Sequence, residues 1–283
     1  MIGLGLLGGS ITLRVLRSFL SAKAVGYSHR SITREKARQL AIANEIADDI
    51  QQSVRNADAV ILATPICTFE DIFRKIGPAL KRGCIVTDVG STKVLPHHWA
   101  AKRLPGTVHY VGSHPIAGSE QRGIEFARDD LFDGAMCILT TTARTNRRAV
   151  EMLREFWSKL GCRVKTMSPA RHDRVLANVS HLPHVVAAAL INANDSETLK
   201  LAGKGFMDTS RIASGPPNIW SDILITNTKN TIKDIDKIIA ELGKIKKALK
   251  SEDKTQIERL LKKARDKRNT MMDYKMKEKE IQS

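Results

Sequence analysis

The sequence has few cysteines, few aromatic residues and no long apolar run, and each shortage argues against a class of protein. The four cysteines, Cys67, Cys84, Cys137 and Cys162, stand far apart with no C-x-x-C pair, which favours free thiols in a reducing cytoplasm over a disulfide framework. No apolar run reaches the roughly 18–20 residues of a membrane span, and no basic and apolar leader opens the sequence. We therefore expect a cytoplasmic globular protein with no membrane partner.

Positive charge, by contrast, is in excess. The 283 residues carry a formal net charge of +16, and the segment 229–283 alone holds 17 lysines and arginines against 10 acidic residues. Such charge suits nucleic-acid binding, but it also suits a solvated basic face or a field that attracts an anionic substrate and cofactor. Because the basic segment lacks interleaved aromatics, we expect no nucleic acid as partner. A basic nucleic-acid-binding or assembly protein on a degenerate nucleotide-binding fold remains the alternative from a different class.

A glycine motif lies at the start of the sequence. Gly3, Gly5 and Gly8 have the G-x-G-x-x-G spacing that allows a tight turn out of a strand, a close approach of backbone amides to a pyrophosphate, and packing of the next helix. That helix would also offer its free N–H groups to the phosphates. Since only Met1 and Ile2 precede the motif, we expect about five to eight residues of the first strand to lie upstream, a usual strand length.

Strand and helix patterns alternate through the first part of the chain. Strand-like runs lie at 24–27, 57–64, 84–89, 108–112, 136–140 and 163–167, and helical patterns at 10–20, 33–44 (with Thr33 as cap), 69–80 and 147–160. This alternation predicts an α/β fold with a Rossmann-type doubly wound, mostly parallel sheet. Beyond Ser168 helical patterns dominate, among them 232–249 and 255–272. We expect a dinucleotide-binding domain over 1–168 and an all-helical substrate and dimerisation domain over 169–283.

Two polar clusters follow predicted strands, where doubly wound folds place their ligands. One is the loop Gly90-Ser91-Thr92-Lys93. The other is the loop expected at 112–120, in which His114 would serve as a general base or hydrogen-bond acceptor because its ordinary pKa lies near neutrality. A histidine that only caps a turn is the competing interpretation.

A third cluster lies in the helical half. His181 and His184 are three residues apart and would share a helix face. A metal site lacks a third ligand with supporting spacing, so we expect none. Arg211 stands in a polar stretch where its guanidinium would grip a carboxylate bidentately, although an ordinary surface arginine gives the same pattern.

In their order along the chain, these motifs resemble one family. The glycine turn and the Gly90–Lys93 loop are followed by His114-Pro115-Ile116-Ala117-Gly118-Ser119-Glu120, Ser180-His181-Leu182-Pro183-His184, Gly205-Phe206, Asp208-Thr209-Ser210-Arg211-Ile212-Ala213 and Pro217-Asn218-Ile219-Trp220-Ser221-Asp222-Ile223. Over nearly its whole length the sequence is similar to prephenate dehydrogenases and the related arogenate and cyclohexadienyl dehydrogenases of tyrosine biosynthesis.

The resemblance implies an oxidative decarboxylation with hydride transfer to a nicotinamide cofactor. His114 would hydrogen-bond the substrate's 4-hydroxyl and help to remove its proton, while Ser91 orients both. Arg211 would bind a substrate carboxylate. The other substrate-binding residues implied are Ser180, His181 and His184 in the pocket and Ser119 and Glu120 at its mouth. Another NAD(P) dehydrogenase of the β-hydroxyacid type is the competing enzyme; it would need a catalytic lysine that we cannot place.

The cofactor choice depends on the residues after the second strand. An NAD enzyme usually places Asp or Glu there to hold the ribose 2′-hydroxyl, whereas segment 26–33 holds no carboxylate. Ser28, His29, Arg30 and Thr33 would instead bind a 2′-phosphate, which favours NADP over NAD. The full set of expected cofactor-binding residues is Gly3, Gly5, Leu6, Leu7, Gly8, Ser28, His29, Arg30, Thr33 and Thr64.

The helical half is expected to form a homodimer. Its amphipathic helices carry more apolar surface than one small α/β domain covers, and the resemblance implies dimerisation through this domain. The chain departs from the family pattern at Lys204, which stands inside the usually glycine-rich run before Gly205-Phe206.

Overall fold

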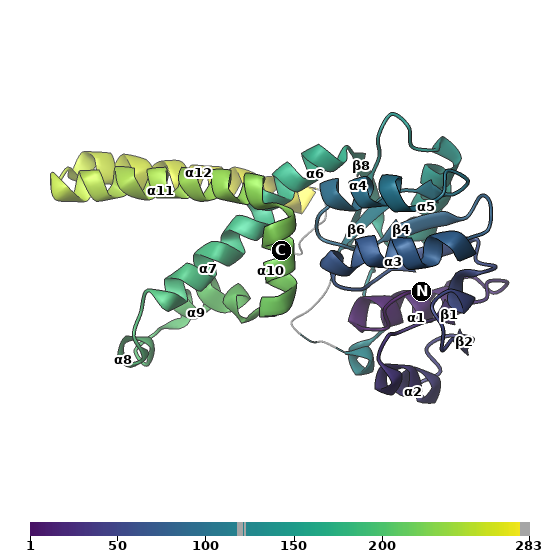
Figure 1. Cartoon of the computed structure of the whole chain (residues 1–283). Coiled ribbons are helices and arrows are strands. Elements are labelled where there is room, and N and C mark those ends of the chain that lie inside the picture. The colour runs from purple at the N-terminus through teal and green to yellow at the C-terminus, as the bar shows by residue number, and fades with distance from the viewer. Residues whose placement is uncertain (118–120, 122, 278–283) are drawn as a thin grey trace. The chain divides into compact units, whose positions relative to one another are not determined.

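The computed structural model of the protein describes residues 1–117, 121 and 123–277 (Figure 1). The chain divides into two compact units, Met1–Thr228 and Lys229–Ser283. The strands all belong to the first unit: β1 (Val25–Gly26), β2 (Glu45–Ile46), β3 (Ala59–Leu62), β4 (Ile85–Asp88), β5 (His109–Tyr110), β6 (Gly112–Ile116), β7 (Met136–Thr140) and β8 (Arg163–Met167).

The parallel strands follow the order of a Rossmann fold. Ile2 bridges in parallel to Tyr27 on one side and to Leu62 on the other, so the order runs β2, β1, Ile2, β3, β4, β5. This is the arrangement in which dinucleotides bind where the strand order reverses. The expected doubly wound, mostly parallel sheet is therefore confirmed.

Helices cover both faces of this sheet. The helices of the first unit are α1 (Leu6–Ser18), α2 (Ser31–Gln39), α3 (Phe69–Ile76), α4 (Val94–Arg103), α5 (Arg147–Lys159), α6 (Pro169–Leu176), α7 (Leu182–Asn192), α8 (Ser196–Leu199), α9 (Lys204–Ser210) and α10 (Pro217–Thr226). Ile61 packs with the residues of α1 and α5, whereas its neighbours Val60 and Leu62 pack with those of α3. Alternate burial toward two faces explains why these strands are continuous apolar runs.

Strand β6 corrects the loop that the sequence predicts over 112–120. Residues Gly112–Ile116 pair antiparallel with β7, and His114 lies opposite Ile138. Gly112 and Pro115 interrupt the residue pattern typical of a strand. However, β6 is the edge of its three-stranded sheet, where a proline is tolerated. The strand fixes the position of His114 far more tightly than a loop would.

The first two helices also begin earlier than predicted. Helix α1 starts at Leu6, directly after the glycine turn, and α2 starts at Ser31 with Arg30 at its N-cap. Thr33 therefore lies inside the first turn of α2, and the prediction that it caps this helix is wrong. The extended backbone of Arg30 already brings the chain into the helix two residues sooner.

Helices α6 and α7 form one run interrupted by a π-helical turn. Ser168 caps α6 by accepting a hydrogen bond from the Arg171 N–H, and Ala177–His181 then form a π-helix before α7 continues. The whole run, Pro169–Asn192, is long and apolar enough to cross a membrane by length and composition alone.

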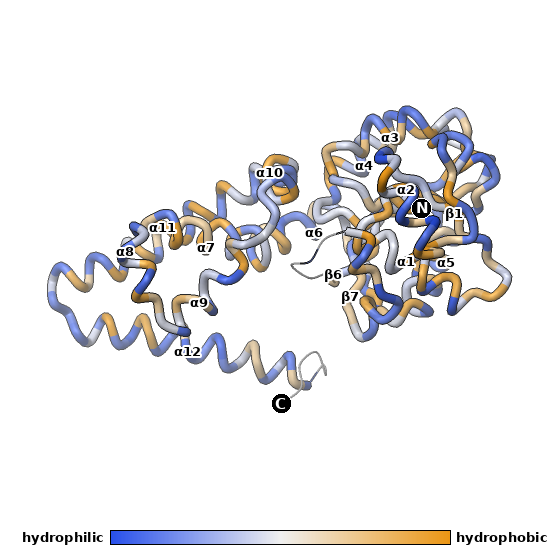
Figure 2. Tube along the Cα trace, turned by 90° about the horizontal axis from the view of Figure 1, so that it is seen from below, coloured by the Kyte–Doolittle hydropathy of each residue, from blue (hydrophilic) through white to orange (hydrophobic). Residues whose placement is uncertain are grey.

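The second unit is a pair of long helices. They are α11 (Thr228–Lys250), whose first residue belongs to the first unit, and α12 (Lys254–Lys277). Both agree with the helical patterns expected at 232–249 and 255–272. Figure 2 shows hydrophobic and hydrophilic residues alternating along both helices, as amphipathic helices require.

Candidate active site

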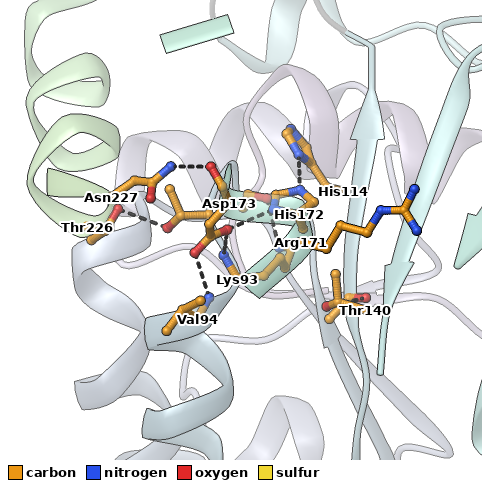
Figure 3. Close-up of polar contacts among 12 residues, drawn as sticks. Lys93, Val94, His114, Thr140, Arg171, His172, Asp173, Thr226 and Asn227 are labelled. Carbon is orange, nitrogen blue, oxygen red and sulfur yellow. Dashed lines mark hydrogen bonds and ion pairs between the residues drawn. The ribbon is translucent and has the colours of Figure 1, made fainter. Parts of the chain in front are cut away.

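His114 lies in a row of buried polar groups at the junction of β6 and α6. Its Nδ1 is 2.9 Å from Nε2 of His172, and Nδ1 of His172 is 2.8 Å from Oδ1 of Asp173. Figure 3 shows this row, with His172 facing His114 and Asp173 facing Lys93 and Val94. His172 and Asp173 are at most 1% exposed, so solvent does not compete for these hydrogen bonds.

Asp173 is held by the first residues of α4. Its Oδ1 accepts a hydrogen bond from the Lys93 N–H at 2.7 Å, and its Oδ2 accepts one from the Val94 N–H at 2.8 Å (Figure 3). A carboxylate at a helix N-terminus satisfies N–H groups that have no partner within the helix and interacts favourably with the helix dipole. Burial raises the pKa of Asp173, and these amides oppose that shift.

Asn227 joins α6 to the next two helical segments. Its Nδ2 donates to the backbone carbonyl of Asp173 at 2.7 Å and lies 3.2 Å from Nδ1 of His181. Thr226, at the end of α10, pairs with Thr92 of the loop after β4 at 2.9 Å. The loop after β4, α6, the π-turn and α10 therefore meet at one buried polar centre.

A buried ion pair lies beside His114. The Lys93 ammonium is fully buried, pairs with Asp88 at the end of β4 and donates to the Gly90 carbonyl at 2.7 Å. Tyr110 donates to the second oxygen of Asp88 at 2.6 Å. Burial is the main cause that lowers the pKa of His114 well below its ordinary value, and the nearby Lys93 ammonium lowers it further. His114 is therefore a neutral imidazole at pH 7.

Within the part of the chain that the structure describes, His184 and His181 each have a buried side-chain nitrogen without a hydrogen-bond partner. The unpaired atoms are Nδ1 of His184 and Nε2 of His181. The His184 ring stacks on Trp220 of α10 with centroids 3.6 Å apart, and Gly215 makes room for the stack because a Cβ there would lie 2.3 Å from Nε1 of Trp220. Unpaired buried polar atoms are costly, so these nitrogens suit a polar ligand.

The remaining predicted substrate residues lie on elements that border this centre. Ser91 is half-buried in the loop after β4, and Ser180 is half-buried in the π-turn. Arg211 is exposed at the start of a 3-10 turn (Arg211–Ser214) that contacts α7. Ser119 and Glu120 lie outside the described residues. Among residues 1–117, 121 and 123–277, no group of three His, Cys, Asp or Glu is placed to hold a metal ion.

The glycine turn has the shape that a pyrophosphate needs. Gly3 adopts a positive φ of 97°, and a Cβ on Gly8 would lie 1.9 Å from the Gly3 carbonyl oxygen, so both positions require glycine. Around Gly5, at the N-cap of α1, a Cβ would meet nothing within 4 Å. Thr64 lies next to Gly3, and Leu6 and Leu7 pack into the core behind the turn. The open space in front of Gly5 fits a dinucleotide phosphate.

The residues after β1 also leave a helix N-terminus open. Arg30, the N-cap of α2, gives it no side-chain hydrogen bond, and both His29 and Arg30 are exposed. Ser28 is buried, and its carbonyl accepts a hydrogen bond from Arg34 at 2.8 Å. Arg34 in turn binds Asp48 at 2.9 Å, and Arg38 binds the same carboxylate at 2.8 Å, so the charge of Asp48 is paired.

Sequence reasoning missed His172, Asp173, Lys93 and Asn227 as site residues. His172 and Asp173 stand among arginines in segment 170–174, which is typical of a solvated helix face. The available signal was the cap Ser168: with α6 beginning at Pro169, both residues fall in its first turns, close to the preceding strand. Lys93 was noted within the loop after β4, but its full burial follows only from the fold.

This fold and site define a dehydrogenase that depends on a nicotinamide dinucleotide. Residues 12–166 match the family described as "Prephenate dehydrogenase, nucleotide-binding domain", and residues 168–263 match "Prephenate dehydrogenase, dimerization domain". The chain belongs to the prephenate dehydrogenase family, and the predicted oxidoreductase activity of tyrosine biosynthesis is confirmed.

Individual relatives agree along nearly the whole chain. A cyclohexadienyl dehydrogenase of Zymomonas mobilis is 34% identical over 89% of this chain and 88% of its own length. The Aquifex aeolicus prephenate dehydrogenase in complex with hydroxyphenyl propionate and NAD+ is 33% identical, with a TM-score of 0.89 over 95% of this chain and 96% of its own. The Synechocystis arogenate dehydrogenase is 31% identical, with a TM-score of 0.82 over 95% and 98% of the two chains. The three relatives are named for different substrates, so similarity to them does not decide which substrate this protein uses.

Proposed function

We propose that this protein oxidatively decarboxylates prephenate or arogenate with transfer of a hydride to NADP in preference to NAD. The observation that carries the proposal is His114, a neutral imidazole fixed on a strand and hydrogen-bonded to the buried His172. A neutral imidazole accepts a proton, which is the role of a general base.

The glycine turn would hold the pyrophosphate at Gly5, with the N-terminus of α1 facing the phosphates. When bound, the nicotinamide supplies the hydride acceptor. Every other part of the reaction depends on the chain's own side chains.

In the reaction, His114 draws the proton of the 4-hydroxyl while the hydride leaves the carbon that bears it. The bond to the 1-carboxylate then breaks, its electrons enter the ring, and CO2 departs. His114 returns its proton to the oxygen of the new phenol, so the step needs no other acid. A base that draws charge onto oxygen as the hydride leaves lowers the barrier.

The substrate carboxylates are assigned to the helical side of the site. Arg211 offers a guanidinium that binds carboxylates bidentately, and Ser180, His181 and His184 would face the ring and side chain. Ser91 would orient the hydroxyl toward His114. Ser119 and Glu120 remain predictions at the pocket mouth.

The preference for NADP rests on the residues after β1. Ser28 stands where an NAD enzyme usually has a carboxylate, while His29 and Arg30 are exposed around the open N-terminus of α2, and Thr33 lies in its first turn. A 2′-phosphate would be attracted by these groups. The Ser28→Asp variant should therefore lose affinity for NADP and gain affinity for NAD.

The deciding experiment measures reduced-cofactor absorbance with prephenate and arogenate, each with NADP and NAD. Turnover of either substrate supports the proposal, and the two specificity constants assign the substrate. No turnover in any of the four combinations would refute it. A wild-type preference for NAD over NADP would overturn the cofactor assignment alone.

We also propose that the protein is a cytoplasmic homodimer. Helix α11 exposes Ile239, Leu242 and Leu249, each more than half accessible, on one stripe three and seven residues apart. A second copy that packs its own helices on this stripe would bury it, in keeping with the description of the matching family domain.

A further inference from the structure

We propose that Asp173 and His172 act as positioning residues that fix the tautomer of His114, so that Nδ1 of His114 carries the hydrogen and Nε2 presents its lone pair to the substrate. The positions of the hydrogens follow from the geometry of one buried row. The catalytic consequence rests on the proposed function.

The row begins at atoms whose hydrogen-bonding roles cannot change. The backbone N–H groups of Lys93 and Val94 only donate, so both oxygens of Asp173 act as acceptors, at 2.7 and 2.8 Å. Oδ1 of Asp173 also faces Nδ1 of His172 at 2.8 Å. The Val94 and Lys93 amides and the Lys93 ammonium favour the ionised form of Asp173, which only accepts hydrogen bonds, so Nδ1 of His172 carries the hydrogen.

A neutral imidazole has one donor and one acceptor. With its hydrogen on Nδ1, His172 accepts at Nε2, which lies 2.9 Å from Nδ1 of His114. Nδ1 of His114 must then donate, and its Nε2 is left as the acceptor. Each assignment follows from the previous one, and the first depends on the backbone amides and on the ionised carboxylate that they and Lys93 favour.

The surroundings support two neutral imidazoles. Burial lowers the pKa of both His114 and His172, and the nearby Lys93 ammonium lowers each further. An additional proton on either ring would make both of its nitrogens donors. Such a proton is therefore disfavoured at pH 7. The Asn227 bond to the Asp173 carbonyl, at 2.7 Å, holds α6 in place behind the row.

The row also gives His172 and Asp173 a role in the reaction. As Nε2 of His114 takes the substrate proton, the new positive charge is shared through Nδ1–H with His172 and the Asp173 carboxylate behind it. Reversing the tautomer would place a hydrogen where the lone pair must be, which in comparable sites is a large loss.

The experiment reads the hydrogen positions directly. In protein labelled with 15N-histidine, long-range 1H–15N correlation spectra distinguish an imidazole with hydrogen on Nδ1 from one with hydrogen on Nε2, and His114→Asn identifies the His114 signal. We expect the Nδ1–H form for both His114 and His172. A His114 with its hydrogen on Nε2 would overturn the proposal, whether or not the enzyme turns over prephenate or arogenate.

Kinetics then separate positioning from folding. His172→Leu removes the acceptor for His114 Nδ1–H and should lower kcat by about 10²–10⁴-fold, the usual contribution of a general base, with KM unchanged. His172→Gln keeps an acceptor oxygen and should recover part of the loss, and the exposed His98→Gln serves as the matched control. Equal kcat in His172→Leu and wild type would contradict the proposal.

Discussion

At the scale of single residues, the buried state of His114 determines how activity depends on pH. Burial and the charge of Lys93 lower the pKa of His114, so its neutral, proton-accepting form persists at pH values where an ordinary imidazole is half protonated. We expect kcat/KM to stay level as the pH falls from 8 to 6.5 and to decline only below that range. An acidic limb with a midpoint near 6.5 in initial-rate measurements would show that His114 is not the base or is not buried in solution.

The glycine motif offers a second test at this scale. A methyl on Gly5 would point into open space, whereas one on Gly8 would lie 1.9 Å from the Gly3 carbonyl oxygen. Gly5→Ala should keep the fold but weaken NADP binding by about 5- to 150-fold, the equivalent of a 1–3 kcal/mol overpacking cost. Gly8→Ala should fail to fold.

Calorimetric titration and thermal unfolding of each variant provide the measurement. Gly106→Ala, which also adds a methyl in open space, is the control and should leave both quantities unchanged. If Gly5→Ala binds NADP as tightly as the control, the pyrophosphate does not approach this turn.

The sequence alone was informative about some residues and silent about others, for physical reasons. The glycine turn is a local backbone requirement, so it is visible in six consecutive letters. His114 was found through a motif, but its strand was missed because β6 is stabilised by pairing with β7, whose partner residues lie twenty or more positions further along the chain. His172 and Asp173 gain their importance only from contacts with α4 and β6, which no local pattern records.

At the scale of elements, the cap of α6 should matter more for catalysis than that of α5. Ser168 and Asn146 each accept one hydrogen bond from the first turn of their helix, and loss of such a cap costs about 0.5–2 kcal/mol. Ser168→Ala and Asn146→Ala should therefore lower the free energy of unfolding by similar amounts. Only Ser168→Ala should also lower kcat, because α6 carries His172 and Asp173.

Chemical denaturation and steady-state kinetics of the two variants test this expectation. Equal kcat in both would indicate that the bonds of Asp173 to α4 hold α6 without its cap.

Helix bounds were predicted well where apolar periodicity is strong, as in α5, and poorly at α2. There, the cap is the backbone conformation of Arg30 and not a recognisable capping side chain.

At the scale of the whole molecule, buried histidines make the fold sensitive to acid. Burial lowers the pKa of His97 and His181 to about 4 each, and lowers those of His114 and His172 as well. Between pH 6.5 and about 4 the unfolded chain binds more protons than the folded one, so stability falls as the pH falls, by about 1.4 kcal/mol per pH unit for each such imidazole. The raised pKa of Asp173 has the opposite effect on stability, but Asp173 is only one group.

Denaturant unfolding between pH 7.5 and 5 should therefore show a steep loss of stability that begins near pH 6.5. His97→Gln should make the curve shallower, since it removes one of the contributing groups. A stability that stays constant to pH 5 would mean that these imidazoles are solvated in the native state.

Association is the other property of the whole molecule that can be tested. Leu242→Glu places a charge in the middle of the exposed stripe on α11, where it would be costly to bury in an interface. Light scattering should find a dimer for the wild type and a monomer for this variant. The matched variant Leu20→Glu alters a side chain that is 97% exposed in the other unit and should remain dimeric.

The order of strands and helices was accessible from the sequence, but the division of the chain was less so. The predicted boundary at Ser168 rests on the end of strand alternation and stays a prediction. The structure groups α6 to α10 with the sheet in one compact unit up to Thr228. That grouping arises from contacts such as Lys93–Asp173 and Thr92–Thr226, which depend on tertiary packing and leave no periodic signal.

The π-helical turn between α6 and α7 sets the relative directions of the side chains on the two helices. Each residue of an α-helix advances the chain by about 100° around the axis, so one residue more or fewer resets the direction of everything that follows. Deleting the exposed Val179 would restore regular winding and rotate His184 away from Trp220, while His172 stayed in place. The relative orientation of His172 and His184 thus depends on the π-turn between them, and a one-residue deletion there would change how the substrate is held while the row behind His114 stayed in place.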